Sequence, residues 1–142
     1  MIAPTRELAK QIYDFVVAIS VYLKIKVHLC TGGTKVITDT MKLKEGCHIV
    51  VGTPGRVFDM MEKGYLGTGS LKMLIIDEAD EMLGLGFLEQ INEIIQLIPP
   101  DCQILLFSAT MSKDIITLTK DIMNTPAKIL VKKENLTLEG IK

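Results

Sequence analysis

The sequence has almost no net charge, no long apolar run and few cysteines. Its 142 residues carry a formal net charge of −1. This excludes wholesale electrostatic binding of a polyanion, so any nucleic-acid contact must come from individually placed groups. No apolar run approaches the ~20 residues that a membrane-spanning helix needs, and the first residues lack the basic and apolar regions of a signal peptide. With 48% hydrophobic and 23% charged residues, the chain is expected to form one packed domain.

The three cysteines are Cys30, Cys47 and Cys102. Their odd number, long spacings and apolar neighbours predict reduced thiols in an intracellular protein, cytoplasmic or alternatively nuclear. The sequence contains no Cys-x-x-Cys or His-Glu-x-x-His pattern, which argues against a zinc site. His28 and His48 both lie in strand-like runs and are interpreted as structural.

Apolar runs typical of strands alternate with segments of helical periodicity along the whole chain. Strands are expected over 1–3, 26–31, 47–51, 71–76, 103–107 and 127–131. Helices are expected over 8–19, 34–44, 54–63, 87–98 and 112–122. The buried face of the first helix is expected to carry Leu8, Ile12, Phe15, Val16 and Ile19. This alternation predicts an α/β fold, with a mostly parallel sheet and helices on both of its faces.

Three carboxylates follow the apolar run at 74–76, namely Asp77, Glu78 and Asp80. In an open α/β sheet this end of a strand is where ligands bind. One Asp to hold Mg²⁺ and one Glu to orient or deprotonate a water is a minimal set for metal-assisted phosphate chemistry. The alternative is an acidic helix N-terminus that only complements the helix dipole. On these residues alone both interpretations stay open.

The other strand-to-helix junctions must lie at the same edge of a parallel sheet, and they are rich in groups that contact phosphate. Thr5 and Thr53 are candidate helix N-caps, and free N–H groups at a helix N-terminus bind phosphate. Arg6 and Arg56 add donors for a phosphodiester oxygen, and Gly32-Gly33 allows close approach of a backbone. Taken singly, each junction is better interpreted as a cap, a turn or a surface charge. Together they predict a grip on a sugar-phosphate chain, without reading of bases.

Ser108-Ala109-Thr110 places two hydroxyls at the same edge. They are expected to hydrogen-bond to a neighbouring carboxylate such as Asp80, and so to sense events at the metal. Simple helix capping is the alternative for this tripeptide.

These residues resemble the motifs of the DEAD-box ATP-dependent RNA helicases. Asp77-Glu78-Ala79-Asp80 is the motif that names the family. The segments 4–9, 32–33, 53–56 and 108–110 match its other first-domain motifs in order and at suitable spacing. The similarity covers the whole chain, and the intervening stretches are most similar to the translation-initiation branch of the family.

The resemblance implies a three-layer, RecA-like fold of the P-loop NTPase type, and ATP and Mg²⁺ as cofactors. Asp77 would hold Mg²⁺ on ATP, Glu78 would activate the attacking water, and Asp80 with Ser108 and Thr110 would couple nucleotide state to RNA binding. The RNA backbone, single-stranded or in a short duplex, would lie along Pro4, Thr5, Arg6, Gly32, Gly33, Thr53, Gly55 and Arg56. Protein regulators of the initiation-factor or mRNA-processing type are expected as partners, and binding to a membrane is not expected.

The family's glutamine motif and its Gly-Lys-Thr phosphate loop would precede Pro4, and neither is in this sequence. Residues 1–131 are therefore expected to be a first RecA-like domain truncated at its N-terminus, and 132–142 a linker to a second domain. The 142 residues alone are expected not to hydrolyse ATP. The absent strand is expected beside the strand that ends at Ile76, and its absence is expected to leave unpaired edges.

Two alternatives were weighed against this interpretation. One is a non-enzymatic RNA- or protein-binding module on a degenerate helicase domain, against which the intact Asp77 and Glu78 argue. The other is a different nucleotide-dependent α/β enzyme, which the Ser-Ala-Thr and Thr-Pro-Gly-Arg junctions disfavour.

Overall fold

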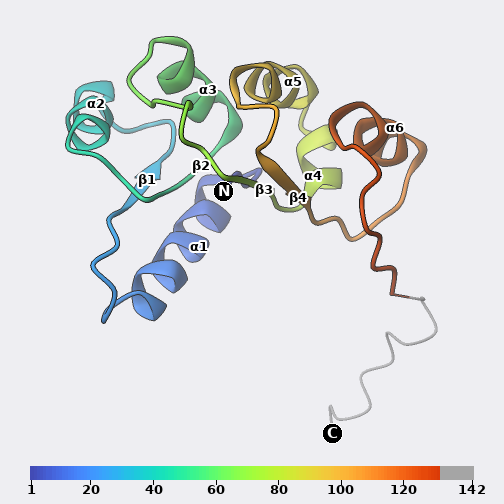
Figure 1. The fold of residues 1–142 in the computed structure, drawn as a ribbon, viewed down its shortest axis with the longest axis horizontal. Helices are drawn as coiled ribbons and strands as arrows, with labels where there is room; N and C mark the ends of the chain where they lie inside the picture. Colours follow the sequence, from blue (N-terminus) through green and yellow to red (C-terminus); the bar gives the residue numbers. More distant parts are fainter. Residues whose placement is uncertain (132–142) are drawn as a thin grey trace, which may run out of the picture.

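The computed structural model describes residues 1–131, in which helices and strands alternate (Figure 1). The elements are α1 (Arg6–Ile19), β1 (Val27–Cys30), α2 (Val36–Lys44), β2 (Ile49–Gly52), α3 (Pro54–Glu62), β3 (Met73–Ile76), α4 (Ala79–Gly84), α5 (Leu88–Leu97), β4 (Gln103–Leu106) and α6 (Lys113–Ile122). In this part of the chain no helix is both long and apolar enough to cross a bilayer. The expected linker, 132–142, lies outside the described residues.

All strand pairings are parallel, as the alternating pattern predicts. β1 pairs with β2, and β3 pairs with β4. The segment Met1–Ala3 lies between these two pairs, because Ile2 bridges to Gly52 on one side and to Ile76 on the other. Its backbone is bonded in both directions, with Ile2 N donating to Ile75 O at 2.8 Å and Ala3 N donating to Gly52 O at 2.9 Å. The strand order is therefore β1, β2, the Met1–Ala3 segment, β3 and β4.

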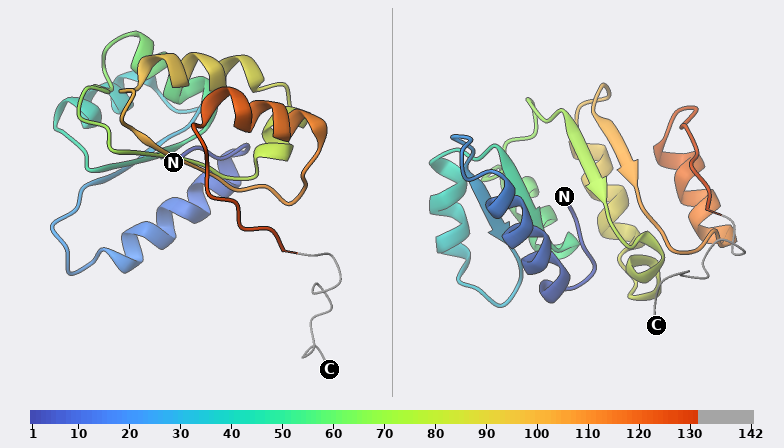
Figure 2. Two further views of the ribbon diagram at one scale, coloured as in Figure 1. Left: turned by 45° about the vertical axis from the view of Figure 1, so that its right-hand side comes forward. Right: turned by 90° about the horizontal axis from the view of Figure 1, so that it is seen from below.

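Helices cover both faces of this sheet, which confirms the predicted layers. Figures 1 and 2 show α1 alone on one face and α2, α3 and α5 on the other. The main core lies on the three-helix side and includes Met60, Ile76, Ile91 and Ile94, each with no exposed surface. Ile2 is 1% exposed at the centre of the sheet. Its burial contributes about 2–3 kcal/mol and holds the two strand pairs together.

Two sequence-based expectations are wrong in detail. Phe15 and Ile19 of α1 are 65% and 62% exposed, whereas Val16 between them is 8% exposed, so these two members of the expected apolar face are not buried. The segment 127–131 is not a strand, and Ile129 within it is 95% exposed. An apolar β-branched run forms a strand only where a neighbour can pair with its N–H and C=O groups, and no described residue does so here.

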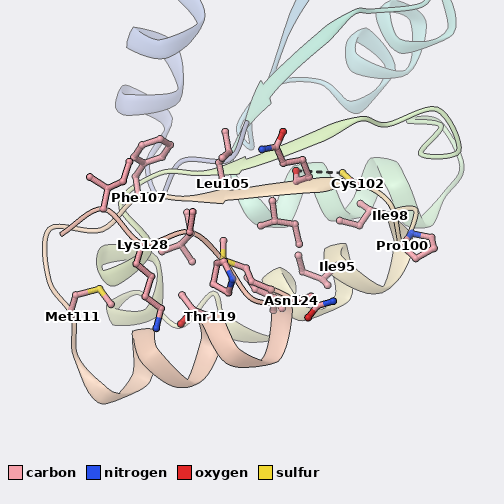
Figure 3. Close-up of a pocket in the computed structure, with 18 of the residues that line it drawn as sticks. Ile95, Ile98, Pro100, Cys102, Leu105, Phe107, Met111, Thr119, Asn124 and Lys128 are labelled. Carbon is pink, nitrogen blue, oxygen red and sulfur yellow. Dashed lines mark hydrogen bonds between the residues drawn. The ribbon is translucent and has the colours of Figure 1, made fainter.

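A groove separates the segment 127–131 from its nearest potential partner, the edge of β4. A groove of about 720 Å³ runs along the outer edge of β4, between it and 126–130 (Figure 3). Leu105 and Phe107, from β4 and the residue that follows it, lie along this groove. The expectation of an open edge beside the strand that ends at Ile76 is therefore wrong. β3 has hydrogen-bonded neighbours on both sides. Among the described residues the edge strands are β1 and β4, and it is the edge of β4 that borders the groove.

Candidate functional site

The strand-to-helix junctions meet at one edge of the sheet, because every strand runs in the same direction. Three of them, from widely separated parts of the sequence, border a single shallow pocket of about 440 Å³. Its lining consists of Pro4, Thr5, Arg6, Glu7, Gly32, Thr53, Gly55, Arg56 and Phe87. Seven of the eight residues expected to track a sugar-phosphate backbone are in this lining, and the eighth, Gly33, adjoins it. The predicted clustering is therefore present.

Arg6 lies over the turn at Gly32 and Gly33. A Cβ added at Gly33 would be 2.9 Å from Arg6 Cζ, and one at Gly32 would be 3.7 Å from Arg6 Nη2. Gly33 also has φ +84°, a conformation that residues with a Cβ rarely adopt. The two glycines thus let an arginine side chain rest directly on the backbone of the turn.

Two helices begin at the rim of the pocket. Thr5 caps α1 as predicted, since its Oγ1 accepts a hydrogen bond from Leu8 N at 3.2 Å. Pro54 occupies the first turn of α3, also as predicted, but the side chain of Thr53 makes no capping bond. Gly55 has nothing within 4 Å of an added Cβ. Both helix N-termini therefore present backbone N–H groups towards the open pocket, where an anion is favoured.

Arg56 is bound into the protein more firmly than a surface cation. Its side chain is 11% exposed, and Nη1 donates to Asp39 Oδ2. The guanidinium also donates to Thr34, from Nη2 to the carbonyl oxygen at 2.9 Å and from Nη1 to Oγ1 at 3.3 Å. Part of its donor capacity is thus used to hold the residue that follows Gly33.

Asp39 lies on the buried side of α2, and sequence reasoning missed it. Its side chain is 3% exposed, and its second oxygen, Oδ1, lies 2.9 Å from His28 Nε2. The signal for it was present, because α2 has an inverted pattern. Asp39 and Thr40 face inward, whereas Ile37 and Met41 are 61% and 59% exposed. The partnership with Asp39 agrees with the structural role predicted for His28.

The acidic residues follow β3, one strand position away from the Met1–Ala3 segment. Asp77 is half-buried, and its Oδ1 accepts the N–H of Glu78 at 2.9 Å. Glu78 is exposed and has φ +49°, an uncommon conformation for a residue other than glycine, at the N-cap position of α4. Backbone strain of this kind is found most often at functional sites.

Asp80 is linked to the Ser108-Ala109-Thr110 segment, as the sequence predicts. Thr110 Oγ1 donates to Asp80 Oδ2 at 3.0 Å, and Ser108 Oγ donates to the carbonyl oxygen of Thr110 at 2.8 Å. Burial alone raises the pKa of Asp80, but the hydrogen bonds from Thr110 and from the N–H of Glu81 outweigh it and lower the pKa. The two segments are also joined through the backbone, where Ala79 N donates to Phe107 O at 2.9 Å.

The residues that the structure describes contain no cluster of three His, Cys, Asp or Glu side chains that would hold a metal ion by itself. Magnesium rarely requires one, since it binds one or two carboxylates together with phosphates and water. Asp77 fits this use, because the described residues donate no hydrogen bond to its Oδ2. The donor set is therefore suited to a magnesium ion that arrives with a phosphate ligand.

Phe87 was also missed by sequence reasoning. It lies between α4 and α5, is half-buried, and is the one aromatic residue among the described residues that line the pocket. Its spacing fits the apolar face of α5, so the sequence offered no sign that it would border the pocket.

Comparison with known proteins gives one consistent family. The family described as DEAD/DEAH box helicase matches residues 1–118. The chain is 55% identical over all 142 residues to a protein of Cryptosporidium parvum named eukaryotic initiation factor 4A. It is 54% identical to the ATP-dependent RNA helicase eIF4A of Neurospora crassa. The chain spans 35% and 36% of the length of these two relatives.

Solved structures with the same fold agree. A DEAD box protein from the hyperthermophile Methanococcus jannaschii superposes with a TM-score of 0.82 at 38% identity, over 87% of this chain and 34% of that one. The yeast DEAD-box splicing factor Prp28 superposes with a TM-score of 0.81 at 33% identity, over 87% of this chain and 30% of that one. At these identities the similarity extends beyond the fold to much of the sequence.

Proposed function

Because the chain belongs to the DEAD/DEAH box helicase family, we propose that it forms the RNA-backbone track and the ATP-hydrolysis motif of an ATP-dependent RNA helicase of the initiation-factor-4A type. The observation that carries the proposal is the gathering of three sequence-distant junctions around one pocket. The acidic motif lies at the same edge of the sheet.

The RNA would be held by its phosphates along this pocket. Arg6 supplies an exposed guanidinium, and the N-termini of α1 and α3 supply N–H groups and the positive ends of two helix dipoles. Gly32 and Gly55 add no side chain to the pocket lining, and Gly33 leaves room for the guanidinium of Arg6. Contacts of this kind fix the position of the strand and carry little sequence information, so binding is expected to be nearly independent of base sequence.

ATP would be bound beside the end of β3. Asp77 would hold the Mg²⁺ that accompanies the nucleotide, and bound Mg²⁺ would neutralise charge on the phosphates. Glu78 would orient the attacking water and accept its proton. These 142 residues contain no Gly-Lys-Thr loop. We therefore propose that ATP turnover needs a phosphate-binding loop from residues other than these 142.

Asp80, Ser108 and Thr110 would transmit the state of the nucleotide. The Thr110–Asp80 hydrogen bond joins the acidic motif to the segment after β4 at a distance of 3.0 Å. A shift of the Asp80 carboxylate on ATP binding would break or tighten this bond, and would so move the segment.

Two relatives are named eukaryotic initiation factor 4A and eIF4A, which supports a proposed role in translation. Protein regulators of the initiation-factor or mRNA-processing type, and a location in the cytoplasm or alternatively the nucleus, complete the proposal. The proposed domain is 1–131, with 132–142 as the connection to a second domain.

The test is ATP hydrolysis with and without single-stranded RNA, measured on the full-length gene product and on this 142-residue chain. Glu78→Gln in the full-length protein is the matched variant, since it keeps the shape of the side chain and removes the base. RNA-stimulated turnover by the full-length protein, lost in Glu78→Gln, is the expected result. RNA binding without turnover by either chain would refute the helicase assignment and favour a non-enzymatic binding module.

A further inference from the structure

Asp39 is a buried carboxylate that no step of the proposed chemistry uses. Its side chain is 3% exposed, and it lies on the inner side of α2, behind the pocket rather than in its lining. A buried carboxylate is costly unless each oxygen is paired. Here each oxygen has one partner, since Oδ2 accepts from Arg56 Nη1 and Oδ1 lies 2.9 Å from His28 Nε2.

These partners connect three elements next to the side of the pocket that Gly32 and Arg56 line. His28 belongs to β1, Asp39 to α2 and Arg56 to the first turn of α3. Arg56 continues the connection to Thr34, whose own hydroxyl donates to Thr31 O at 3.0 Å. The turn at Gly32 and Gly33 is therefore held from beneath at both of its ends.

Asp39 sets the orientation of the Arg56 guanidinium. A guanidinium is a rigid planar fork, so fixing one nitrogen sets the direction of the others. With Nη1 on Asp39, Nη2 reaches the carbonyl oxygen of Thr34 at 2.9 Å. Without this carboxylate, Arg56 would be a long, flexible cation with only neutral acceptors, and the turn would lose its charged anchor.

We propose that Asp39 is a positioning residue for RNA-backbone binding: it holds Arg56 against Thr34, and so keeps the Gly32–Gly33 turn in register with the N-terminus of α3. The inference rests on the proposed function, because it assigns Asp39 to the same RNA site.

The proposal makes a prediction whose sign is opposite to that of simple electrostatics. Removing a negative charge near a polyanion site should strengthen binding if Asp39 acts only through its field. If Asp39 positions the site, the same change weakens binding. A purely structural residue would lower thermal stability and leave the RNA affinity of the folded protein unchanged.

The experiment compares Asp39→Asn with Asp14→Asn in the full-length protein. Asp14 is an exposed carboxylate on α1, 56% accessible and paired with Lys10, so it controls for the loss of one negative charge. Affinity for a fluorescein-labelled oligouridylate is measured by anisotropy, and RNA-stimulated ATP turnover gives KM for RNA and kcat. For Asp39→Asn we expect Kd and KM for RNA to rise about five- to tenfold, with kcat at saturating RNA within about twofold of wild type. Asp14→Asn should leave both unchanged.

A second arm tests whether Asp39 acts through Arg56. In an Arg56→Gln background, Asp39→Asn should weaken RNA binding by less than about twofold further, because coupled residues are not additive. Full additivity, or unchanged or tighter RNA binding by Asp39→Asn alone, overturns the proposal.

Folding is controlled by thermal unfolding of each variant. If Asp39→Asn does not fold, Asp39→Glu replaces it, since it keeps the charge and moves the carboxylate by one methylene. Weaker RNA binding by a folded Asp39→Glu supports the proposal, and wild-type affinity overturns it. The RNA affinity of the wild-type protein is measured before that of any variant. A wild-type protein that binds no RNA would refute the proposed function itself.

Discussion

Gly33 and Gly55 both belong to the proposed RNA track, but the structure predicts opposite effects on stability when each is changed to alanine. Gly33 has φ +84° and lies under the guanidinium of Arg6. Gly55 lies within α3 at an exposed position, with nothing within 4 Å of an added Cβ. The two substitutions add the same methyl group, so each is the control for the other.

The magnitudes follow from backbone conformation. Holding alanine in the left-handed region at Gly33 costs about 1–2 kcal/mol. The far end of Arg6 must also move, which a flexible side chain can do at little further cost. Gly55 is the second residue of α3, so replacing it by alanine stabilises the fold by at most about 0.5–1 kcal/mol, the gain found in a helix interior. The two variants should therefore differ by about 2 kcal/mol, with Gly33→Ala the less stable.

Thermal unfolding of the full-length protein tests the stability difference, which corresponds to about 2–4 °C in Tm for each kcal/mol. Fluorescence anisotropy with a labelled oligouridylate measures the RNA affinity of each variant. Both variants should bind RNA more weakly, because one displaces Arg6 and the other places a methyl group in the pocket lining. A Gly33→Ala protein that unfolds at or above the Tm of Gly55→Ala would refute the conformational argument.

Two further predictions concern protonation. Burial lowers the pKa of the Met1 amino group to about 6. Because the unfolded value is near 8, the 142-residue chain should be most stable above pH 8 and should lose about 2 kcal/mol as the pH falls to 6. Urea unfolding across this range tests it, and an N-acetylated chain that keeps the dependence would contradict it. Thr110→Val removes the hydroxyl that donates to Asp80 and should raise the pKa of that carboxyl. A lowered carboxyl pKa stabilises the fold above about pH 4 and not in acid, so the variant should be less stable than wild type above about pH 4 and equally stable in acid. An NMR titration of Asp80 measures this, with Thr119→Val as control, whose hydroxyl bonds only within α6.

Most of the confirmed predictions for the fold depend on local interactions between residues close in the sequence. Thr5 and Ser112 cap their helices, and Pro54 begins α3, because caps and first-turn prolines depend on only a few neighbouring residues. The meeting of the junctions at one edge also followed from the alternation of strands and helices, because parallel strands leave no other arrangement.

Except for the capping bond expected from Thr53, the wrong predictions depended on partners distant in the sequence. The apolar run at 127–131 has the composition of a strand, but pairing requires a neighbour, and the described residues provide none. The open edge was placed beside β3, because the sequence did not show that Ile2 would occupy that side of it. Phe15 and Ile19 fit an apolar face, but both are exposed in the fold, whereas Val16 between them is buried.

The sequence by itself determined which groups this protein presents: the acidic motif after one strand, the hydroxyls after another, and glycines, threonines and arginines at the remaining junctions. Each of these is a local pattern with its own chemistry. Only the tertiary structure decided that Arg56 is anchored by Asp39 rather than left as a free surface cation, and that Phe87 borders the pocket. A charge 17 residues away in the sequence can fix a guanidinium only after folding has excluded water from between them.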